Sequence, residues 1–319
     1  MPKILATRNP SAFRTRQVSV RHDDRGIHIT PFGPELSFAG MMQLRKPVDR
    51  HSIHLGLASE GYNFANLGVS SVLTTYLDGR EYLILVRQDR PDFGDSVAKL
   101  LSGYMPSDSL VNPLEALAAE VSEEFLPCSD EEVILSGLIN GRALPKPFAD
   151  SAKYEPGLSF QMVDKVNLYN LPDVHDGAVF VGGKQLAEGS PRLYYDATKN
   201  SAQLVFNYHI NFPVLSAIFA LNHGEAHYLR AKNGHLHHSE EVRNGNLLEV
   251  VLHYSGILLV ELDKGSLTPR VFTFSNGAPL PFTGKVLLSE AFAPKTDGVV
   301  SQSNISLEDY LARMRATPQ

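Results

Sequence analysis

Three glutamates, Glu120, Glu123 and Glu124, stand at the spacing i, i+3 and i+4, which an α-helix places on one flank. Like charges at that spacing repel each other and lower the stability of a helix. A bound Mg2+ would turn this repulsion into attraction, because the cation prefers oxygen ligands such as carboxylates. It would also neutralise a bound phosphate and activate a water molecule, while a remaining carboxylate could act as general base. The alternative is a solvated acidic helix face without a ligand.

The glutamates belong to a segment, residues 112–127, that carries the signals of a complete amphipathic helix. Asn112 is a favourable N-cap residue, Pro113 suits the first helical position, and Glu115 follows as in a capping box. Pro127 ends the helix. Apolar residues recur with the helical period and predict a stripe that packs on a core: Leu114, Leu117, Ala118, Val121 and Phe125.

A hairpin over residues 68–88 precedes this helix. Its two arms surround Asp78 and Gly79, a dipeptide that tolerates the positive φ angles of a two-residue turn. Residues 82–86 of the second arm are apolar throughout, which predicts a strand buried on both faces. Two further strands are expected on either side of the helix, over 96–104 and 131–139.

Most of the remaining chain has the pattern of strands. Alternating runs between 155 and 210 indicate several strands, among them a second hairpin with its turn at 196–201. Residues 51–68 are rich in Gly, Asn and His, which is typical of irregular structure or short strands. Within the segment 213–231 a helix bounded by Pro213 and Gly224 is expected, and a terminal helix, with Ser306 as N-cap, is expected over 306–316.

The run Glu-Val-Ser-Glu-Glu at 120–124, together with the order of elements around it, resembles the Nudix box and its surroundings over roughly residues 66–140. The resemblance implies that Glu120, Glu123 and Glu124 bind Mg2+ (or Mn2+) or supply the base. It also implies hydrolysis of a nucleoside-diphosphate-type pyrophosphate. The alternative within the same resemblance is a catalytically inactive Nudix-fold binding or scaffold protein.

Four positions differ from the family's pattern. Ala119 stands where the family has the arginine that orients the glutamates, and Leu126 stands where it has a glycine. Val111 falls where the family has its earlier glutamate, and Gly103 lies two residues upstream of the first glycine position. The glutamate core of the motif is therefore present, while its supporting residues are different.

From these patterns we expect an α/β protein whose centre is a Nudix-like α/β/α sandwich. The central domain is expected at 66–190, after a mixed and irregular N-terminal segment at 1–65. A β-rich C-terminal part with the terminal helix occupies 191–319.

Two other sets of residues could take part in chemistry. Arg87 and Arg90 lie at and just beyond the end of the apolar strand and could reach phosphate oxygens, or form an ordinary charged loop. His235 and His237 would point to one side of a strand, and with Glu241 they resemble part of the first cupin motif, which implies a transition-metal site. The alternative for this histidine-rich stretch is a polar hairpin turn.

Composition narrows the classes of partner. The formal net charge of the chain is -6, and no Lys/Arg block is present, so nucleic-acid binding is not expected. One cysteine allows no intrachain disulfide, which fits a reducing compartment. Without a secretory signal or a long apolar run, we expect a cytoplasmic protein with no membrane contact. Its expected partner is a small nucleotide-type substrate, and homo-oligomer formation is left open.

Overall fold

The apolar strand at 82–86 lies at the centre of the molecule and is buried on both faces. In the computed structural model it belongs to β6 (Arg80–Arg90), and each side chain from Tyr82 to Val86 is buried. Tyr82, Ile84 and Val86 belong to one hydrophobic cluster, and Leu83 and Leu85 belong to a second. The alternation follows from the two-residue period of a strand. The prediction of a doubly buried strand is confirmed.

The structure describes most of the chain, in the following segments. These are residues 3–4, 13–90, 95–129, 133–146, 153–163, 178–186, 191–213, 217–219, 227–232, 235–240, 242–243, 246–247, 257–262, 270–275, 278–293, 295–296, 298–302 and 304–316.

The predicted hairpin is present, and its second arm is β6. The first arm is β5 (Asn66–Leu77), and the turn residues Asp78 and Gly79 both have positive φ, at 50° and 74°. β5 is also the strand on which the sheet is organised. Its first half pairs with β8 (Leu101–Tyr104), its second half with β6, and its other edge with β16 (Ser201–Asn211) in parallel.

The largest sheet closes on itself and contains strands from both sides of residue 190. The remaining strands of this sheet are β7 (Asp95–Lys99), β9 (Leu126–Cys128), β10 (Ile134–Ile139), β11 (Arg142–Ala143), β12 (Tyr154–Met162), β15 (Arg192–Asp196), β17 (Ala217–Phe219), β22 (Ile257–Glu261), β23 (Val271–Ser275), β24 (Ala278–Pro281), β25 (Leu287–Leu288), β26 (Lys295–Thr296), β27 (Val299–Val300) and β28 (Ile305–Ser306). The predicted hairpin with its turn at 196–201 is formed by β15 and β16.

Three smaller sheets complete the strands of the described part. The first has the order β14 (Lys184–Gln185), β13 (Val179–Val181), β3 (Gly26–Ser37), β2 (Arg14–Asp23) and β4 (Tyr62–Phe64). The second contains β1 (Lys3–Ile4), β18 (His227–Lys232) and β19 (His235–Glu240), and the third β20 (Val242–Arg243) and β21 (Asn246–Leu247).

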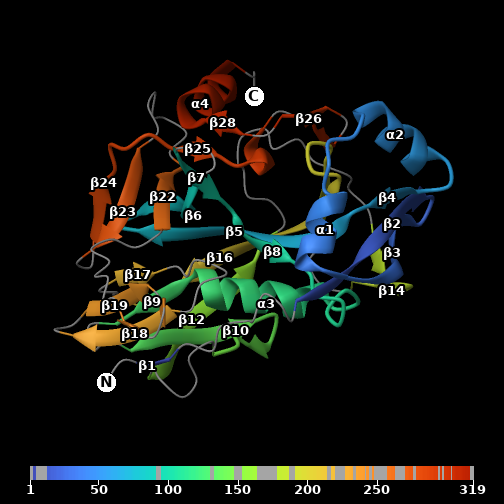
Figure 1. Cartoon of the computed structure of the whole chain (residues 1–319). Coiled ribbons are helices and arrows are strands. Elements are labelled where there is room, and N and C mark those ends of the chain that lie inside the picture. Colours follow the sequence, from blue (N-terminus) through green and yellow to red (C-terminus); the bar gives the residue numbers. More distant parts are fainter. Residues whose placement is uncertain are drawn as a thin grey trace.

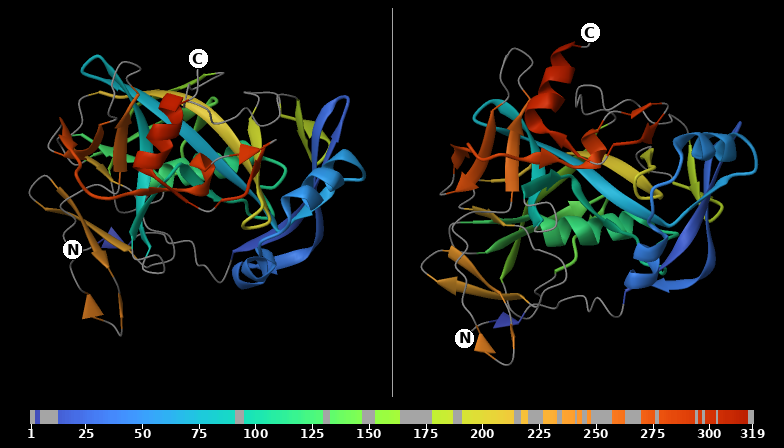
Figure 2. Two further views of the ribbon diagram at one scale, coloured as in Figure 1. Left: turned by 90° about the horizontal axis from the view of Figure 1, so that it is seen from above. Right: turned by 45° about the horizontal axis from the view of Figure 1, so that its top comes forward.

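The helices of the described part are α1 (Phe38–Leu44), α2 (Arg50–Ala58), α3 (Pro113–Glu124), α4 (Leu307–Ala316) and the 3-10 turn η2 (Glu290–Phe292). The α-helices cover two of the sheets: α1 and α2 lie beside β2, β3 and β4, and α3 and α4 lie against the largest sheet (Figures 1 and 2). Figure 1 shows α3 and α4 on opposite sides of β5 and β6. Accordingly, α3 contributes to the first hydrophobic cluster and α4 to the second. The protein is mixed α/β and rich in strands, and none of its described helices is long and apolar enough to cross a membrane.

One expectation about local structure is right only in part, and another is wrong. Residues 51–68, expected to be irregular or to form short strands, contain the short strand β4 but also most of α2, which the Asp49 carboxylate caps by accepting the N–H of Ser52 at 2.9 Å. Ile53 and Leu57, four residues apart, bury one face of this helix in the core. The helix expected between Pro213 and Gly224 is absent from its described part, which forms β17, and the rest of the segment 213–231 contributes β18. β17 pairs with the distant β9, and β18 pairs with the distant β1 as well as with its neighbour β19, so tertiary pairing rather than local periodicity determines these short strands.

Candidate functional site

Helix α3 packs on the largest sheet through the apolar stripe that the sequence predicts. Leu117, Ala118, Val121 and Phe125 are buried, and the helix contacts β8 and β5. Pro113 occupies the first turn as expected. Asn112 is the N-cap residue as predicted, but its side chain accepts no backbone N–H of the first turn.

The Asn112 side chain is engaged elsewhere. Its amide nitrogen donates to Glu115 Oε2 at 2.9 Å, and its Oδ1 accepts a hydrogen bond from Arg142 Nη1 at 3.2 Å. The side chain is therefore held by two other groups and makes no hydrogen bond to the backbone of the first turn.

The flank with the glutamates is largely withdrawn from solvent. Glu120 is 3% exposed and Glu124 is 1% exposed, while Glu123 is half-buried. A solvated acidic face therefore does not describe Glu120 or Glu124. Buried carboxylates need a compensating charge or hydrogen-bond donors, because leaving water is costly for an ion.

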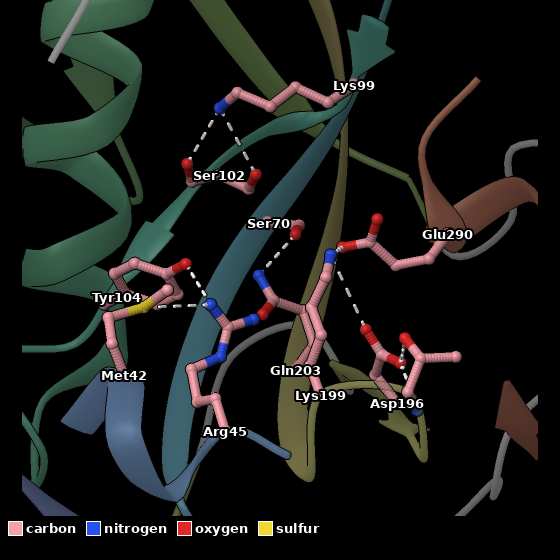
Figure 3. A network of polar contacts seen from close by, with 11 residues as sticks. Met42, Arg45, Ser70, Lys99, Ser102, Tyr104, Asp196, Lys199, Gln203 and Glu290 are labelled. Atoms are coloured by element: carbon pink, nitrogen blue, oxygen red, sulfur yellow. Dashed lines mark hydrogen bonds and ion pairs between the residues drawn. The ribbon is translucent and has the colours of Figure 1, made fainter. Parts of the chain in front are cut away.

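Glu124 obtains both kinds of partner from the turn between β7 and β8. Its Oε1 accepts a hydrogen bond from Lys99 Nζ at 2.7 Å, and its Oε2 accepts the backbone N–H of Ser102 at 2.9 Å. Lys99 ends β7, and Leu100 separates it from β8, so the strand expected over 96–104 is divided in two. This break lets the lysine side chain reach back to Ser102, as Figure 3 shows.

The Glu120 carboxyl group lies directly against Gly103. A Cβ atom placed on Gly103 would lie 2.0 Å from the Glu120 carboxyl carbon, so any larger residue at this position would require the Glu120 side chain to move. The structure thus brings Gly103 to the glutamate flank, although its position in the sequence is shifted from the family's pattern.

As arranged here, the donor set does not fit a divalent cation. Both oxygens of Glu124 already accept hydrogen bonds, one of them from a charged ammonium group. Within the described residues, no group of three or more His, Cys, Asp or Glu side chains could hold a metal ion. Binding of Mg2+ or Mn2+ by Glu120, Glu123 and Glu124 stays a prediction.

A large cavity, of about 1740 Å³, opens beside this flank of α3. We call it the α3 cavity. Ala119, Glu120 and Glu123 of the helix line one wall, and aromatic side chains from the N-terminal part, Phe38 among them, line another. It is larger than the roughly 300–1000 Å³ of ordinary ligand pockets, and side chains of both charge signs line it.

The aromatic wall of the α3 cavity is joined to a guanidinium group. The rings of Phe38 and Tyr104 lie 5.9 Å apart, and Phe13 meets Phe38 edge to face at 6.1 Å. Arg45, at the end of α1, donates a hydrogen bond to the Tyr104 hydroxyl and lies 4.8 Å from the Tyr104 ring centroid (Figure 3). A cluster of aromatic rings therefore stands next to a positive charge.

A second polar cluster lies across the cavity on the turn between β15 and β16. Asp196 is 2% exposed, and its Oδ1 accepts hydrogen bonds from the Thr198 backbone N–H at 2.9 Å and the Thr198 hydroxyl at 2.6 Å. Lys199 Nζ lies 3.8 Å from Asp196 Oδ2 and forms an ion pair with Glu290 (Figure 3). Burial, and then the charge of Glu290, raises the pKa of Asp196, although Lys199 and Thr198 act in the opposite sense.

The sheet between these clusters contributes a further polar pair, which sequence reasoning missed. Gln203 of β16 donates a hydrogen bond to Ser70 Oγ of β5 at 2.6 Å. The two strands are parallel neighbours, so residues 133 positions apart meet on one face. An Asp-x-Thr signal for a capped turn was present at Asp196, but no local pattern connects it to the glutamates of α3.

The other candidate residues lie elsewhere or outside the description. Arg87 is not among the residues that line the α3 cavity, and its guanidinium lies 5.5 Å from the Phe282 ring centroid. Arg90 lies on β6, but its side chain is outside the description. His235 and His237 lie on β19 in the small sheet with β18 and β1. Glu241 falls outside the described residues, so the cupin-like metal site stays a prediction.

Comparison with known proteins assigns no family. No protein-family model matches the sequence, and no curated protein gives a significant match. Among solved structures, the chain is similar to "Crystal structure of MutT/nudix family protein from Enterococcus faecalis", at 8% identity and a TM-score of 0.25. The match covers 79% of this chain, which spans 60% of the length of that protein. A TM-score of this size does not establish a common fold.

Proposed function

We propose that the chain is a small-molecule-binding protein with a Nudix-like arrangement around α3, and that the α3 cavity takes a ligand of nucleotide type without a metal ion. The observation that carries this proposal is the cavity itself, where the glutamate flank of α3 faces an aromatic wall. Phe38 and Tyr104 suit a planar base, and Arg45 suits an anionic or carbonyl group beside it.

Binding is favoured over metal-dependent hydrolysis because of Glu124. This carboxylate would be a metal ligand in the active-enzyme reading, yet Lys99 and the Ser102 N–H occupy it. Ala119, at the position of the family's arginine, leaves the cavity wall open where a long side chain would project. The departures from the family's pattern thus accompany a roomy site whose neighbouring carboxylate, Glu124, is already paired with Lys99.

A ligand panel in buffer with EDTA tests the proposal. Nucleosides, nucleotide sugars and dinucleotides are each screened by thermal shift, and hits are measured by calorimetry. We expect at least one class to bind with one site per chain. Ala119→Phe should weaken that binding at least tenfold, because Ala119 lines the cavity and is only 9% exposed.

Leu138→Phe is the matched control, because Leu138 is exposed on β10 and does not line the cavity. The control should bind like wild type. The proposal is overturned if no class of ligand binds, or if Ala119→Phe and Leu138→Phe bind the ligand equally well.

A second candidate, Mg2+-dependent hydrolysis of a nucleoside-diphosphate-type pyrophosphate, is favoured by one observation. Glu120 and Glu123 both line the α3 cavity and are three residues apart on the helix. Release of a nucleoside monophosphate from the nucleotide sugars and dinucleotides of the panel, with and without Mg2+ or Mn2+, tests it; a phosphatase that cleaves only the newly formed phosphate monoesters turns this release into a phosphate signal. Metal-dependent release that falls about a hundredfold or more in Glu123→Gln would favour the enzyme over the binding protein.

A further inference from the structure

The flank of α3 that looks like a cation site already contains a cation from the chain. Lys99 Nζ lies 2.7 Å from Glu124 Oε1, 3.0 Å from the Ser102 carbonyl oxygen and 3.5 Å from Ser102 Oγ. Carboxylate, carbonyl and hydroxyl oxygens are the ligands that hard divalent cations prefer. An ammonium group therefore sits in an oxygen environment of the kind that a metal ion would use.

The local backbone is shaped around this arrangement. The backbone N–H of Ser102 donates a hydrogen bond to the Glu124 carboxylate, and its carbonyl oxygen accepts one from Lys99, which is itself bonded to Glu124. Both backbone groups of Ser102 therefore support the pair of Lys99 and Glu124. The next residue, Gly103, has no side chain, and the Glu120 carboxyl group occupies that space. Two of the three glutamates are thereby fixed against one dipeptide of β8.

We infer that Lys99 takes the place of a divalent cation at the glutamate flank of α3. The flank is stabilised by an internal ammonium group, and the protein requires no metal ion to fold or to hold its carboxylates. Lys99 and Glu124 are 17% and 1% exposed, so the pair is shielded from the salt and solvent that weaken surface ion pairs. The inference deepens the proposed function, because it explains how the α3 cavity would bind its ligand without metal.

Removing the lysine should convert the flank into a metal site. In EDTA, Lys99→Met should lower the Tm, because it leaves the Glu124 carboxylate buried without its cation. Saturating Mn2+ should then raise the Tm of Lys99→Met by about 5 °C or more, as expected for a ligand at a hundred times its dissociation constant. Wild type should show no Mn2+ shift.

Two further variants identify the site of the effect. Lys99→Met combined with Glu124→Gln should lose the Mn2+ response, because the vacated carboxylate is gone. Lys146→Met is the matched control, since Lys146 lines the same cavity but lies over the Tyr154 ring, at 5.3 Å. It should gain no response to Mn2+.

The inference is overturned if wild type binds Mn2+ and Glu124→Gln abolishes that binding, or if folded Lys99→Met gains no response. If Lys99→Met does not fold, wild type still decides the question. Binding of Mn2+ there, followed by electron paramagnetic resonance and lost in Glu124→Gln, contradicts the inference, and its absence up to millimolar Mn2+ supports it. A failed ligand panel beside a Mn2+ response confined to Lys99→Met would reject the proposed function alone.

Discussion

Two buried carboxylates, Glu124 of α3 and Asp196 in the lining of the α3 cavity, are neutralised in different ways. Glu124 has one ammonium group at 2.7 Å and a backbone N–H at 2.9 Å. Asp196 has hydrogen bonds from Thr198 but shares the more distant Lys199 with Glu290. One site is a closed pair, whereas the other is an open cluster with more negative than positive charge. The closed pair is suited to hold structure, and the open cluster is suited to respond to pH or to a charged ligand.

The largest expected difference between the two sites is the loss of stability when the lysine of each site is replaced. In metal-free buffer, Lys99→Met should lower the free energy of unfolding by about 3–5 kcal/mol, the usual cost of leaving a buried partner uncompensated. Lys199→Met should cost at most about 1 kcal/mol, because Lys199 is 33% exposed, its closer partner Glu290 is 20% exposed, and Asp196 lies at 3.8 Å and keeps its hydrogen bonds from Thr198. Urea unfolding of the two variants beside wild type measures both values.

A double variant separates the pair from the packing of the lysine stem. Lys99→Met with Glu124→Leu should recover most of the lost stability, because replacing both members of a buried ion pair by apolar groups is often nearly neutral. Equal losses in Lys99→Met and Lys199→Met, or no recovery in the double variant, would break the contrast between a closed pair and an open cluster.

Glycine substitutions provide the next comparison. A Cβ on Gly103 would lie 2.0 Å from the Glu120 carboxyl carbon, and a Cβ on Gly68 would lie 2.1 Å from Gln203 Oε1. Gly103→Ala should cost about 1–3 kcal/mol, because a buried carboxylate must move. Gly68→Ala should cost about 1 kcal/mol, since the half-buried Gln203 loses its bond to Ser70. Urea unfolding measures both, and the ranking should not reverse.

The cause of the loss at Gly103 can be checked directly. Shortening the opposing side chain in the double variant Gly103→Ala with Glu120→Ala removes the group that the new Cβ meets. The combined loss should then be smaller than the sum of the two single losses, as expected for neighbours that share one contact. A strictly additive result would place the cost of Gly103→Ala in the backbone of β8 instead.

The open cluster should make the stability of the protein depend on pH through Asp196. The pKa of Asp196 is raised above its ordinary value of 3.8, so the folded state binds this proton more tightly than the unfolded state. The contribution of Asp196 to stability is therefore full below pH 3.8 and falls as the pH rises through the raised pKa. The stability of Asp196→Asn relative to wild type should accordingly increase over that window and then level off. Urea unfolding across a pH series measures it.

Asp23 provides a control with the opposite sign. Its pKa is lowered by hydrogen bonds from His28 and from the Arg25 backbone, so its contribution is present above pH 3.8 and is lost as the pH falls through the lowered pKa. Asp23→Asn should therefore be less stable than wild type above pH 3.8, and this difference should disappear as the pH falls. Asp196→Asn should instead become more stable relative to wild type as the pH rises. Parallel pH dependences for the two variants would contradict the assignment.

Sequence reasoning captured the features of the fold that local chemistry determines. The turn at Asp78 and Gly79 follows from their tolerance of positive φ, and the burial of β6 follows from its unbroken apolar run. Pro113 and the apolar stripe located α3 for the same reason. Asn112 is the N-cap residue as predicted, but it makes no capping hydrogen bond, since its side chain contacts Glu115 and Arg142, which lies 30 positions further along the chain.

The candidate site was predicted only in part, because its composition depends on contacts between distant segments. The glutamate spacing marked the correct flank of α3, but Lys99 reaches it only through the break at Leu100 between β7 and β8. The far wall comes from the turn after β15, and its place beside α3 follows from the pairing of β16 with β5. No periodicity in the sequence predicts that Lys99 or the turn after β15 lies close to α3.

The smallest expected effects compare the hydrogen-bond donors of the two carboxylates. Thr198→Val removes the hydroxyl that donates a hydrogen bond to Asp196 at 2.6 Å, and it should lower the free energy of unfolding by about 1 kcal/mol. Ser102→Ala removes only the Ser102 hydroxyl, 3.5 Å from Lys99, and should change stability by less than about 0.5 kcal/mol. The backbone N–H and carbonyl of residue 102 remain in that variant, and they are the groups that hold Glu124 and Lys99. Urea unfolding in EDTA resolves the two values, and a loss in Ser102→Ala as large as in Thr198→Val would mean that the closed pair depends on the side chain at residue 102.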